Sequence, residues 1–171
     1  MLEVKALLFD VFGTVVDWRT GIAKEIQIIA KKYNIFLNAE DFADAWRAEY
    51  QPAMEEIRNG GRDFTILDIL HLENLKKIAP RFDLNNLTNE DLNFLVTAWH
   101  RLPGWSDTSQ GLNKLKKKFI LATQSNGNIA LMVNMAKYSN LNWDVILGAE
   151  VVGHYKPEPK AYLKACEALN L

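Results

Sequence analysis

The sequence has little cysteine, almost no net charge and no long hydrophobic run. Cys166 is the single cysteine among 171 residues, which excludes an internal disulfide and favours a reducing compartment, so a cytoplasmic location is expected. The 20 Lys and Arg residues nearly balance the 21 Asp and Glu residues. The resulting net charge of −1 gives no electrostatic basis for binding nucleic acid or a membrane surface. No apolar run approaches a membrane span, and the charged start, Met1 to Lys5, lacks the apolar core of a signal peptide.

The sequence does contain enough apolar residues for a core, since 49% of the chain is hydrophobic. Its most informative stretch is LLFDVFGTVVD, from Leu7 to Asp17. The apolar residues predict a buried strand that ends at Asp10, and the Gly-Thr pair at 13–14 predicts a turn directly after it. Ligands bind at the carboxyl ends of strands in open α/β sheets, and an aspartate there can act as a covalent nucleophile. The alternative is an ordinary core strand that ends in a turn.

The hydrophobic spacing divides the chain into a helical insert and an alternating core. Helices are expected on one face from Ile22 to Ala30, then at 39–58, at 64–78, and after Thr88 as an N-cap. From residue 102, helices at 112–118, 129–138 and 159–169 alternate with strands at 119–123 and 144–147. Strands separated by helices imply a parallel sheet with right-handed crossovers. The predicted fold is therefore α/β, a doubly wound, Rossmann-like core (1–16 and 102–171) with a helical cap (17–101).

Two polar segments follow the later predicted strands. The first, TQSNGN at 123–128, offers a hydroxyl at Ser125, an amide at Asn126 and backbone N–H groups that can cradle an anion. It is also common turn chemistry. The second, HYKPEPKAY at 154–162, places Lys156 before a proline in a loop that opens a helix. Alone, such a lysine would be a surface residue, but its order after the other two motifs favours a place at the same sheet edge.

These motifs, in this order, resemble those of the haloacid dehalogenase superfamily, whose phosphatases read Asp-x-Asp-Gly-Thr. Phe12 stands where those phosphatases have their second Asp, the general acid, and this is the form seen in the 2-haloacid dehalogenase branch. The spacing from Lys156 to Tyr162 and the Trp46-Arg47 pair are also similar to type II (S)-2-haloacid dehalogenases. The resemblance covers essentially the whole chain. It implies hydrolysis of carbon–halogen bonds in small 2-haloalkanoic acids through an aspartyl ester.

Three residues are the expected catalytic groups. Asp10 would attack the α-carbon of the haloacid and expel halide. The Lys156 ammonium beside it would favour the ionised carboxylate, and Thr14 would orient it. The expected substrate-binding residues surround this group. Arg47 would bind the carboxylate or the leaving halide, and Ser125 and Asn126 would bind the carboxylate or steady Asp10. Phe12 and Tyr162 complete the set, with Tyr162 orienting the groups in contact with the substrate.

The resemblance implies that the reaction needs no metal and no other cofactor. The three histidines also show no metal-ligand spacing. The expected partner is a small carboxylic acid, and a homodimer is allowed. Two alternatives remain open: a magnesium-dependent phosphatase acting on a small metabolite, and a non-catalytic or truncated relative. Superfamily members continue past the final helix here with an acidic fourth motif, so the resemblance implies that the C-terminal part of the core is missing and the sequence is a fragment.

Overall fold

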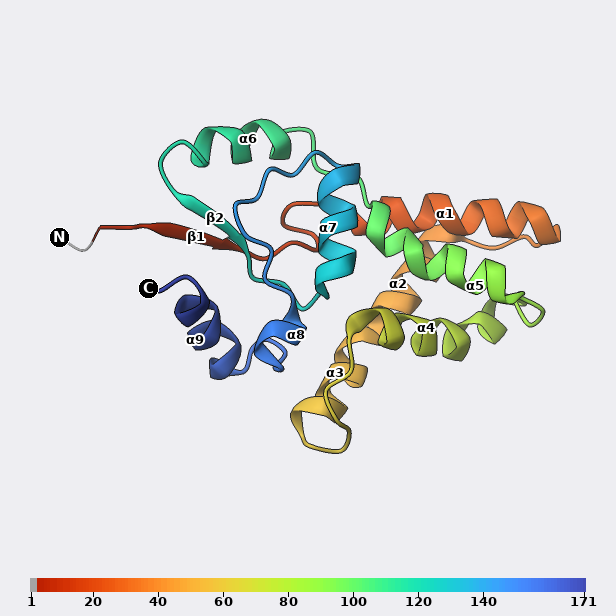
Figure 1. Cartoon of the computed structure of the whole chain (residues 1–171). Coiled ribbons are helices and arrows are strands. Elements are labelled where there is room, and N and C mark those ends of the chain that lie inside the picture. Colours follow the sequence, from red (N-terminus) through yellow and green to blue (C-terminus); the bar gives the residue numbers. More distant parts are fainter. Residues whose placement is uncertain (1–2) are drawn as a thin grey trace.

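Two parallel strands with helices around them form an α/β protein in the computed structural model, which describes residues 3–171 (Figure 1). Strands β1 (Ala6–Phe9) and β2 (Ile120–Thr123) pair in parallel, with Ala6 opposite Ile120 and Phe9 opposite Thr123. The main-chain N–H of Gln124 then donates to the Phe9 carbonyl at 2.7 Å. The parallel α/β core is thereby confirmed, and the segments that follow the two strands lie at one edge of the sheet.

The strand expected at 144–147 is wrong as a regular strand. It is reduced to one parallel bridge between Ala122 and Val145. Main-chain hydrogen bonds join only the start of the segment to β2: the N–H groups of Asp144 and Val145 donate to the Leu121 carbonyl at 2.9 and 3.2 Å, and the Thr123 N–H donates to the Val145 carbonyl at 3.2 Å. Side chains add to these bonds. The Asp144 carboxylate accepts from the Leu121 N–H at 2.9 Å, and the Thr123 hydroxyl donates to the Leu147 carbonyl at 3.1 Å and accepts from its N–H at 2.9 Å. The segment therefore lies along β2 without regular strand geometry.

Within residues 3–171, six helices lie between β1 and β2 in the sequence, and the first five of them form the right-hand and lower part of Figure 1. These five are α1 (Trp18–Tyr33), α2 (Ala39–Ala48), α3 (Tyr50–Arg58), α4 (Leu67–Ile78) and α5 (Asn89–Val96), with 3-10 turns at Ala79–Phe82 and Thr97–Arg101. After this insert come α6 (Thr108–Leu115), α7 (Ile129–Tyr138), α8 (Ala149–Val152) and α9 (Pro159–Ala168). Within residues 3–171, none of these helices is long and apolar enough to cross a membrane.

The single helix expected over 39–58 is two helices that meet at Glu49. Pro52 lies in the first turn of α3 and has no N–H to donate to the Ala48 carbonyl, so the helical hydrogen-bond ladder is interrupted there. The short helix α8 was also not expected. It spans a single turn and ends at Gly153, whose φ of 67° closes it in the left-handed conformation that glycine adopts at little cost.

The chain enters and leaves the insert through segments that lie side by side. The Asp17 N–H donates to the Pro103 carbonyl at 2.8 Å, and Val16 forms an antiparallel bridge with Gly104. Gly21 lets α1 approach this crossing, because a Cβ there would lie 2.9 Å from side-chain atoms of both Leu102 and Pro103. The insert is therefore held to the core at its base by main-chain contacts.

Aromatic side chains fill the interior of the insert. Trp46 and Trp99 are each 1% exposed and pack edge to face with ring centroids 5.4 Å apart. The Trp46 indole N–H donates to the His71 carbonyl at 3.0 Å, which satisfies its one polar atom.

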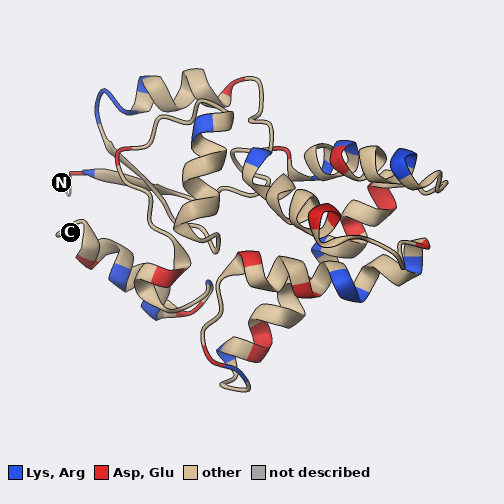
Figure 2. Ribbon diagram, turned by 45° about the vertical axis from the view of Figure 1, so that its right-hand side comes forward, with Lys and Arg blue, Asp and Glu red and all other residues tan. Residues whose placement is uncertain are grey.

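Charged residues of both signs are spread along the ribbons in Figure 2, without a region of a single sign.

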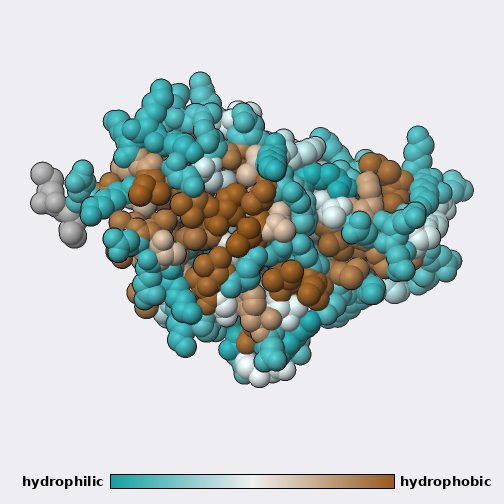
Figure 3. All heavy atoms as spheres, viewed as in Figure 1, coloured by the Kyte–Doolittle hydropathy of each residue, from teal (hydrophilic) through white to brown (hydrophobic). Residues whose placement is uncertain are grey.

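One face of the core is less covered than the rest. Within the described chain β1 pairs with β2 alone, and its four residues are only partly buried, whereas the last three residues of β2 are buried. Figure 3 shows a broad hydrophobic area on the face that carries the strands, between α6 and α9. Unpaired strand edges beside apolar surface are places where further chain can pack.

The N-terminus of α5 offers a test of how this insert is held together. Thr88 forms the expected cap, as part of a capping box with Asp91. The buried Asp91 carboxylate also accepts from Lys32 Nζ at 2.6 Å and from the Tyr33 hydroxyl at 2.5 Å. Burial alone would raise the pKa of Asp91, but the hydrogen bonds from Lys32, Tyr33 and Thr88 outweigh it and hold the pKa well below its usual range.

We expect Asp91→Asn to lower the free energy of unfolding by about 2 kcal/mol, because it removes the charge that three donors satisfy in a buried place. Glu90→Gln is the matched control, since Glu90 is exposed in the same helical turn and its loss should cost less than about 0.5 kcal/mol. Urea denaturation at pH 7 measures both. Equal costs for the two variants would contradict this account of α5.

Candidate active site

Asp10 follows β1 directly, and both of its carboxylate oxygens have partners. Lys156 Nζ donates to Oδ1 at 2.8 Å, and the Thr14 hydroxyl donates to Oδ2 at 2.9 Å. The Asp10 side chain is 47% exposed, whereas that of Lys156 is 17% exposed. The turn that returns Thr14 to Asp10 needs Gly13, whose φ is 87°. The arrangement is an accessible carboxylate held between a cation and a hydroxyl.

The loop after β2 holds Lys156 in place. Asn126 Oδ1 accepts from the Lys156 main-chain N–H at 2.7 Å, and Asn126 Nδ2 contacts the Met54 sulfur at 3.4 Å. The Ser125 hydroxyl accepts from the Gly127 N–H at 3.2 Å and so closes the turn. Both Ser125 and Asn126 are buried. The loop therefore links the core, the catalytic lysine candidate and helix α3 of the insert.

Arg47 reaches the site from α2 with an unused donor. Its guanidinium carbon lies 3.7 Å from the centre of the Tyr50 ring and 5.6 Å from that of Trp18. Its terminal nitrogen Nη1 is buried and has no hydrogen-bond partner among the described residues. A buried charged donor without an acceptor is costly, so this geometry suits an anion that accepts from it. The two aromatic faces fix the plane of the guanidinium.

Tyr50 is the residue that the sequence did not single out as part of a site. Burial raises the pKa of Tyr50; Arg47 and a hydrogen bond with Asn126 act against this, while the charge of Asp10 adds to it. The contact that places Tyr50 at the site is with the Arg47 guanidinium, 3.7 Å from the centre of its ring. The sequence does place Tyr50 three positions after Arg47, a spacing at which two helical side chains can touch. Tyr50 fits an apolar stripe of the helix equally well, so this spacing did not identify it as a site residue.

Phe12 and Tyr162 differ in where the structure places them. Phe12 is 8% exposed and meets Trp99 edge to face at 5.9 Å, so it joins the turn after β1 to the aromatic interior of the insert. Tyr162 is 45% exposed on α9 and makes no hydrogen bond to the group around Asp10. The neighbouring Ala161 faces inward and its carbonyl accepts from Gln124, which turns Tyr162 outward. Its expected role stays a prediction.

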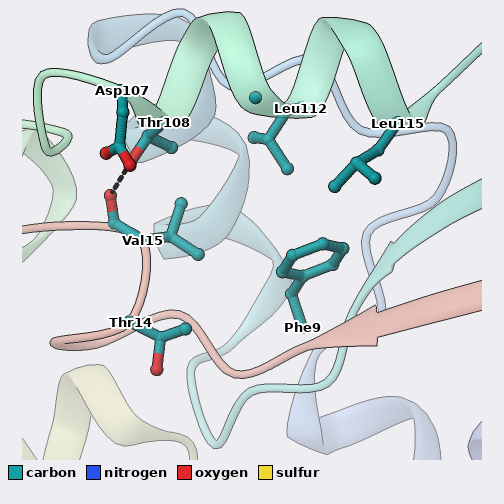
Figure 4. A pocket seen from close by; sticks show the side chains of 8 residues that line it. Phe9, Thr14, Val15, Asp107, Thr108, Leu112 and Leu115 are labelled. Atoms are coloured by element: carbon teal, nitrogen blue, oxygen red, sulfur yellow. Dashed lines mark hydrogen bonds between the residues drawn. The ribbon is translucent and has the colours of Figure 1, made fainter.

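A hollow of about 160 Å³ lies beside the turn, between β1 and α6 (Figure 4). Apolar side chains of Phe9, Val15, Leu112 and Leu115 line most of it, and the Thr108 hydroxyl donates to the Val15 carbonyl at 2.9 Å. Its lining includes Thr14 but neither Asp10 nor Lys156. The hollow is therefore separate from the charged groups of the candidate site.

The three histidines take other roles. His100 pairs with Asp68 at 3.0 Å and His154 with Glu158 at 2.6 Å, whereas the His71 ring stacks on Trp99 at 4.3 Å. Within residues 3–171, no group of three or more His, Cys, Asp or Glu side chains is placed to hold a metal ion.

Comparison with known proteins identifies the family. Residues 4–171 match the family model of the haloacid dehalogenase-like hydrolases. The chain belongs to this family. It is 29% identical over 175 residues to (S)-2-haloacid dehalogenase 1 of Pseudomonas sp. (strain CBS-3), and 25% identical over 178 residues to (S)-2-haloacid dehalogenase 4A of Burkholderia cepacia. These alignments cover 100% and 99% of this chain, and 73% and 71% of the two relatives.

Solved structures agree with this assignment. The crystal structure of a defluorinating L-2-haloacid dehalogenase matches with a TM-score of 0.96 and 45% identity, over 99% of this chain and 70% of that chain. That of a second L-2-haloacid dehalogenase matches with a TM-score of 0.93 and 42% identity, over 99% of this chain and 72% of that chain. The family and the α/β fold predicted from the motifs are confirmed.

The buried side chain of His71 should make the free energy of unfolding of the protein depend on pH. The residue is 2% exposed, and burial lowers its pKa to about 3, with Asp68 opposing the shift and Arg47 adding to it. An unfolded histidine has a pKa of about 6.5. Between these values the unfolded chain binds a proton that the folded chain does not, so the free energy of unfolding rises with pH in this window.

We expect His71→Gln to reduce this slope by up to about 1.4 kcal/mol per pH unit between pH 5 and 6. Urea denaturation at several pH values measures the free energy of unfolding of the wild type and of the variant. The difference between the two proteins isolates His71, because all other titrating groups are the same in both. Parallel stability curves for the two proteins would show that His71 is not buried in its neutral form.

Proposed function

We propose that this protein hydrolyses the carbon–halogen bond of small 2-haloalkanoic acids through an ester formed on Asp10. The observation that carries the proposal is the Asp10 carboxylate, accessible at the end of β1 and bonded to Lys156 at 2.8 Å and to Thr14 at 2.9 Å. The similarity to L-2-haloacid dehalogenases at 45% and 42% identity supports the choice of substrate class.

In the first step, one Asp10 oxygen attacks the α-carbon from the side opposite the halogen. The carbon–oxygen bond forms as the carbon–halogen bond breaks, and the halide leaves with the bonding electron pair. The nucleophile must be ionised and oriented, and Lys156 and Thr14 supply a positive charge and a hydroxyl at its two oxygens. This step uses side chains of the chain alone.

In the second step, water attacks the carbonyl carbon of the Asp10 ester. The bond between that carbon and the substrate oxygen breaks, which regenerates the carboxylate and releases a 2-hydroxy acid and a proton. Negative charge develops on the carbonyl oxygen during this attack. Lys156 and Thr14 each hold a different oxygen of the free carboxylate, so whichever of them faces the oxygen that stays the carbonyl oxygen stabilises that charge.

Arg47 is the proposed anion-binding residue. Its buried Nη1 lacks a partner in the described chain, and a guanidinium binds a carboxylate through two parallel hydrogen bonds. A leaving halide would accept from the same donors. Asn126 holds the main chain of Lys156 at 2.7 Å, and Phe12, Trp18 and Tyr50 supply apolar surface. Ser125 supports the region by closing the loop that carries Asn126.

The phosphatase alternative is disfavoured by two residues. Phe12 occupies the position from which phosphatases of this superfamily supply a general acid, and it is buried against Trp99. Asp17, the next carboxylate along the chain, accepts from the Thr20 N–H as the N-cap of α1. Neither side chain is available to protonate a leaving oxygen.

Three further expectations accompany this function as proposals. The helical cap spans residues 17–101, with the core in 1–16 and 102–171. The location is the cytoplasm, a proposal that rests on the single cysteine. A homodimer remains a prediction.

We expect Asp10→Asn to abolish halide release from 2-chloropropionate while leaving the thermal midpoint within a few degrees of the wild type. The amide is not a comparable nucleophile, and the side chain is half exposed. Asp83→Asn is the control, because this exposed carboxylate follows the 3-10 turn at Ala79–Phe82 and asparagine also tolerates the positive φ of this position. A wild type that instead hydrolyses p-nitrophenyl phosphate with magnesium, or an Asp10→Asn variant within tenfold of wild-type rate, would refute the proposal.

We expect Arg47→Lys to raise KM for 2-chloropropionate at least about tenfold, because lysine keeps the charge but loses the paired donors. Arg19→Lys is the matched control: this arginine also pairs with carboxylates, Glu40 and Asp44, but it does so at the surface of the insert. Steady-state kinetics with equal parameters in wild type and Arg47→Lys would leave Arg47 without a role in binding.

A further inference from the structure

We infer that Arg58 is a positioning residue that holds Lys156 in reach of Asp10, so that the helical insert determines where the catalytic lysine lies. The inference rests on the proposed function, since it concerns the same site. It begins from one long-range contact: Arg58 Nη1 donates to the Lys156 carbonyl at 3.0 Å, across 98 positions of the chain.

Arg58 is oriented by its own helix. It is the last residue of α3, and its side chain is 12% exposed. Nε donates to Glu55 at 2.8 Å, and Nη2 donates to the same carboxylate and, at 3.2 Å, to Gln51. Because a guanidinium is planar, fixing Nε and Nη2 also fixes the direction in which Nη1 points. Glu55 and Gln51 on α3 therefore orient the guanidinium so that Nη1 points at the Lys156 carbonyl.

The main chain of Lys156 is held on both sides of its Cα. Asn126 accepts from its N–H at 2.7 Å, and Arg58 donates to its carbonyl at 3.0 Å. Since these two groups define the orientation of the Cα–Cβ bond, they set the direction in which the side chain leaves the backbone. The ammonium then reaches Asp10 Oδ1 at 2.8 Å. One anchor belongs to the core and the other to the insert.

Charge attraction does not explain the Arg58 contact, because Arg58 and Lys156 are both positive. The Glu55 carboxylate neutralises the positive charge of the Arg58 guanidinium, so Nη1 acts as a directional hydrogen-bond donor. A second contact ties the same segment to the insert: the buried Tyr155 hydroxyl donates to the Thr65 carbonyl at 2.5 Å. The segment that carries the lysine is therefore fastened to the insert at two successive residues.

A double-mutant cycle in the full-length protein tests the inference. We expect Arg58→Met to lower kcat about tenfold or more, with KM changed less than about threefold, because a displaced catalytic group costs rate rather than binding. Lys156→Met should cost at least about 100-fold in kcat. Arg58→Met added to Lys156→Met should cost almost nothing further, because the group that it positions is gone. Equal losses in both backgrounds would overturn the inference.

Arg101→Met is the matched control. Arg101 is also partly buried and also donates to a carboxylate and a main-chain carbonyl, those of Glu25 and Phe94, but all of these contacts lie within the insert. Its effect on kcat should be the same with and without Lys156. Arg58→Lys serves as the second variant if Arg58→Met does not fold, and it should show the same dependence on Lys156, since one ammonium cannot reproduce the fork.

A crystal structure of the Arg58 variant separates this inference from the proposed function. We expect the distance between Lys156 Nζ and Asp10 Oδ1 to exceed 4 Å in the variant, against 2.8 Å here. A distance that remains within hydrogen-bond range would overturn the positioning role even if the enzyme is an active dehalogenase. A wild type inactive on 2-chloropropionate would refute the proposed function, while the distance would still decide the role of Arg58.

Discussion

The ion pair between Asp10 and Lys156 is the contact on which the arrangement of the candidate site depends. It joins the end of the first strand to a loop 146 positions later, at 2.8 Å. Parallel pairing of Phe9 with Thr123 brings the segments after β1 and β2 together, and Asn126 in the second segment then holds the main chain of Lys156. The ammonium is mostly shielded from water while the carboxylate is half exposed, so the proposed nucleophile is held beside a positive charge and stays accessible.

The sequence was sufficient to predict the elements whose signals are local. The apolar run before Asp10, the Gly-Thr turn after it and the cap at Thr88 each depend on neighbouring residues, and helix α7 has the bounds that its spacing predicts, 129–138. The meeting of Asp10, Asn126 and Lys156 was also predictable, because successive parallel strands deliver their carboxyl ends to one edge. Order along the chain therefore carried information about proximity in space.

Residues whose roles depend on distant contacts could not be found in this way. Arg58 has the pattern of a surface arginine at a helix end, and only its partner 98 positions away distinguishes it. Tyr50 and His71 lie on helical stripes typical of a core, and their surroundings come from several elements at once. The segment at 144–147 has the composition of a strand, yet the side chains of Asp144 and Thr123 take hydrogen bonds that a ladder would use. The composition of the segment does not show whether side chains or main-chain groups will form these hydrogen bonds.

The break at Glu49 connects these observations. Arg47 lies before it on α2, while Tyr50 and Arg58 lie after it on α3. In one unbroken helix, Arg47 and Arg58 would lie on nearly the same face, about 16 Å apart along the axis. Pro52 interrupts the helical hydrogen-bond ladder, and Glu49, between the two helices, pairs with Lys77 of α4 at 2.6 Å. The insert thereby carries the proposed anion-binding arginine on α2 and the proposed support of Lys156 on α3, one on each side of Glu49.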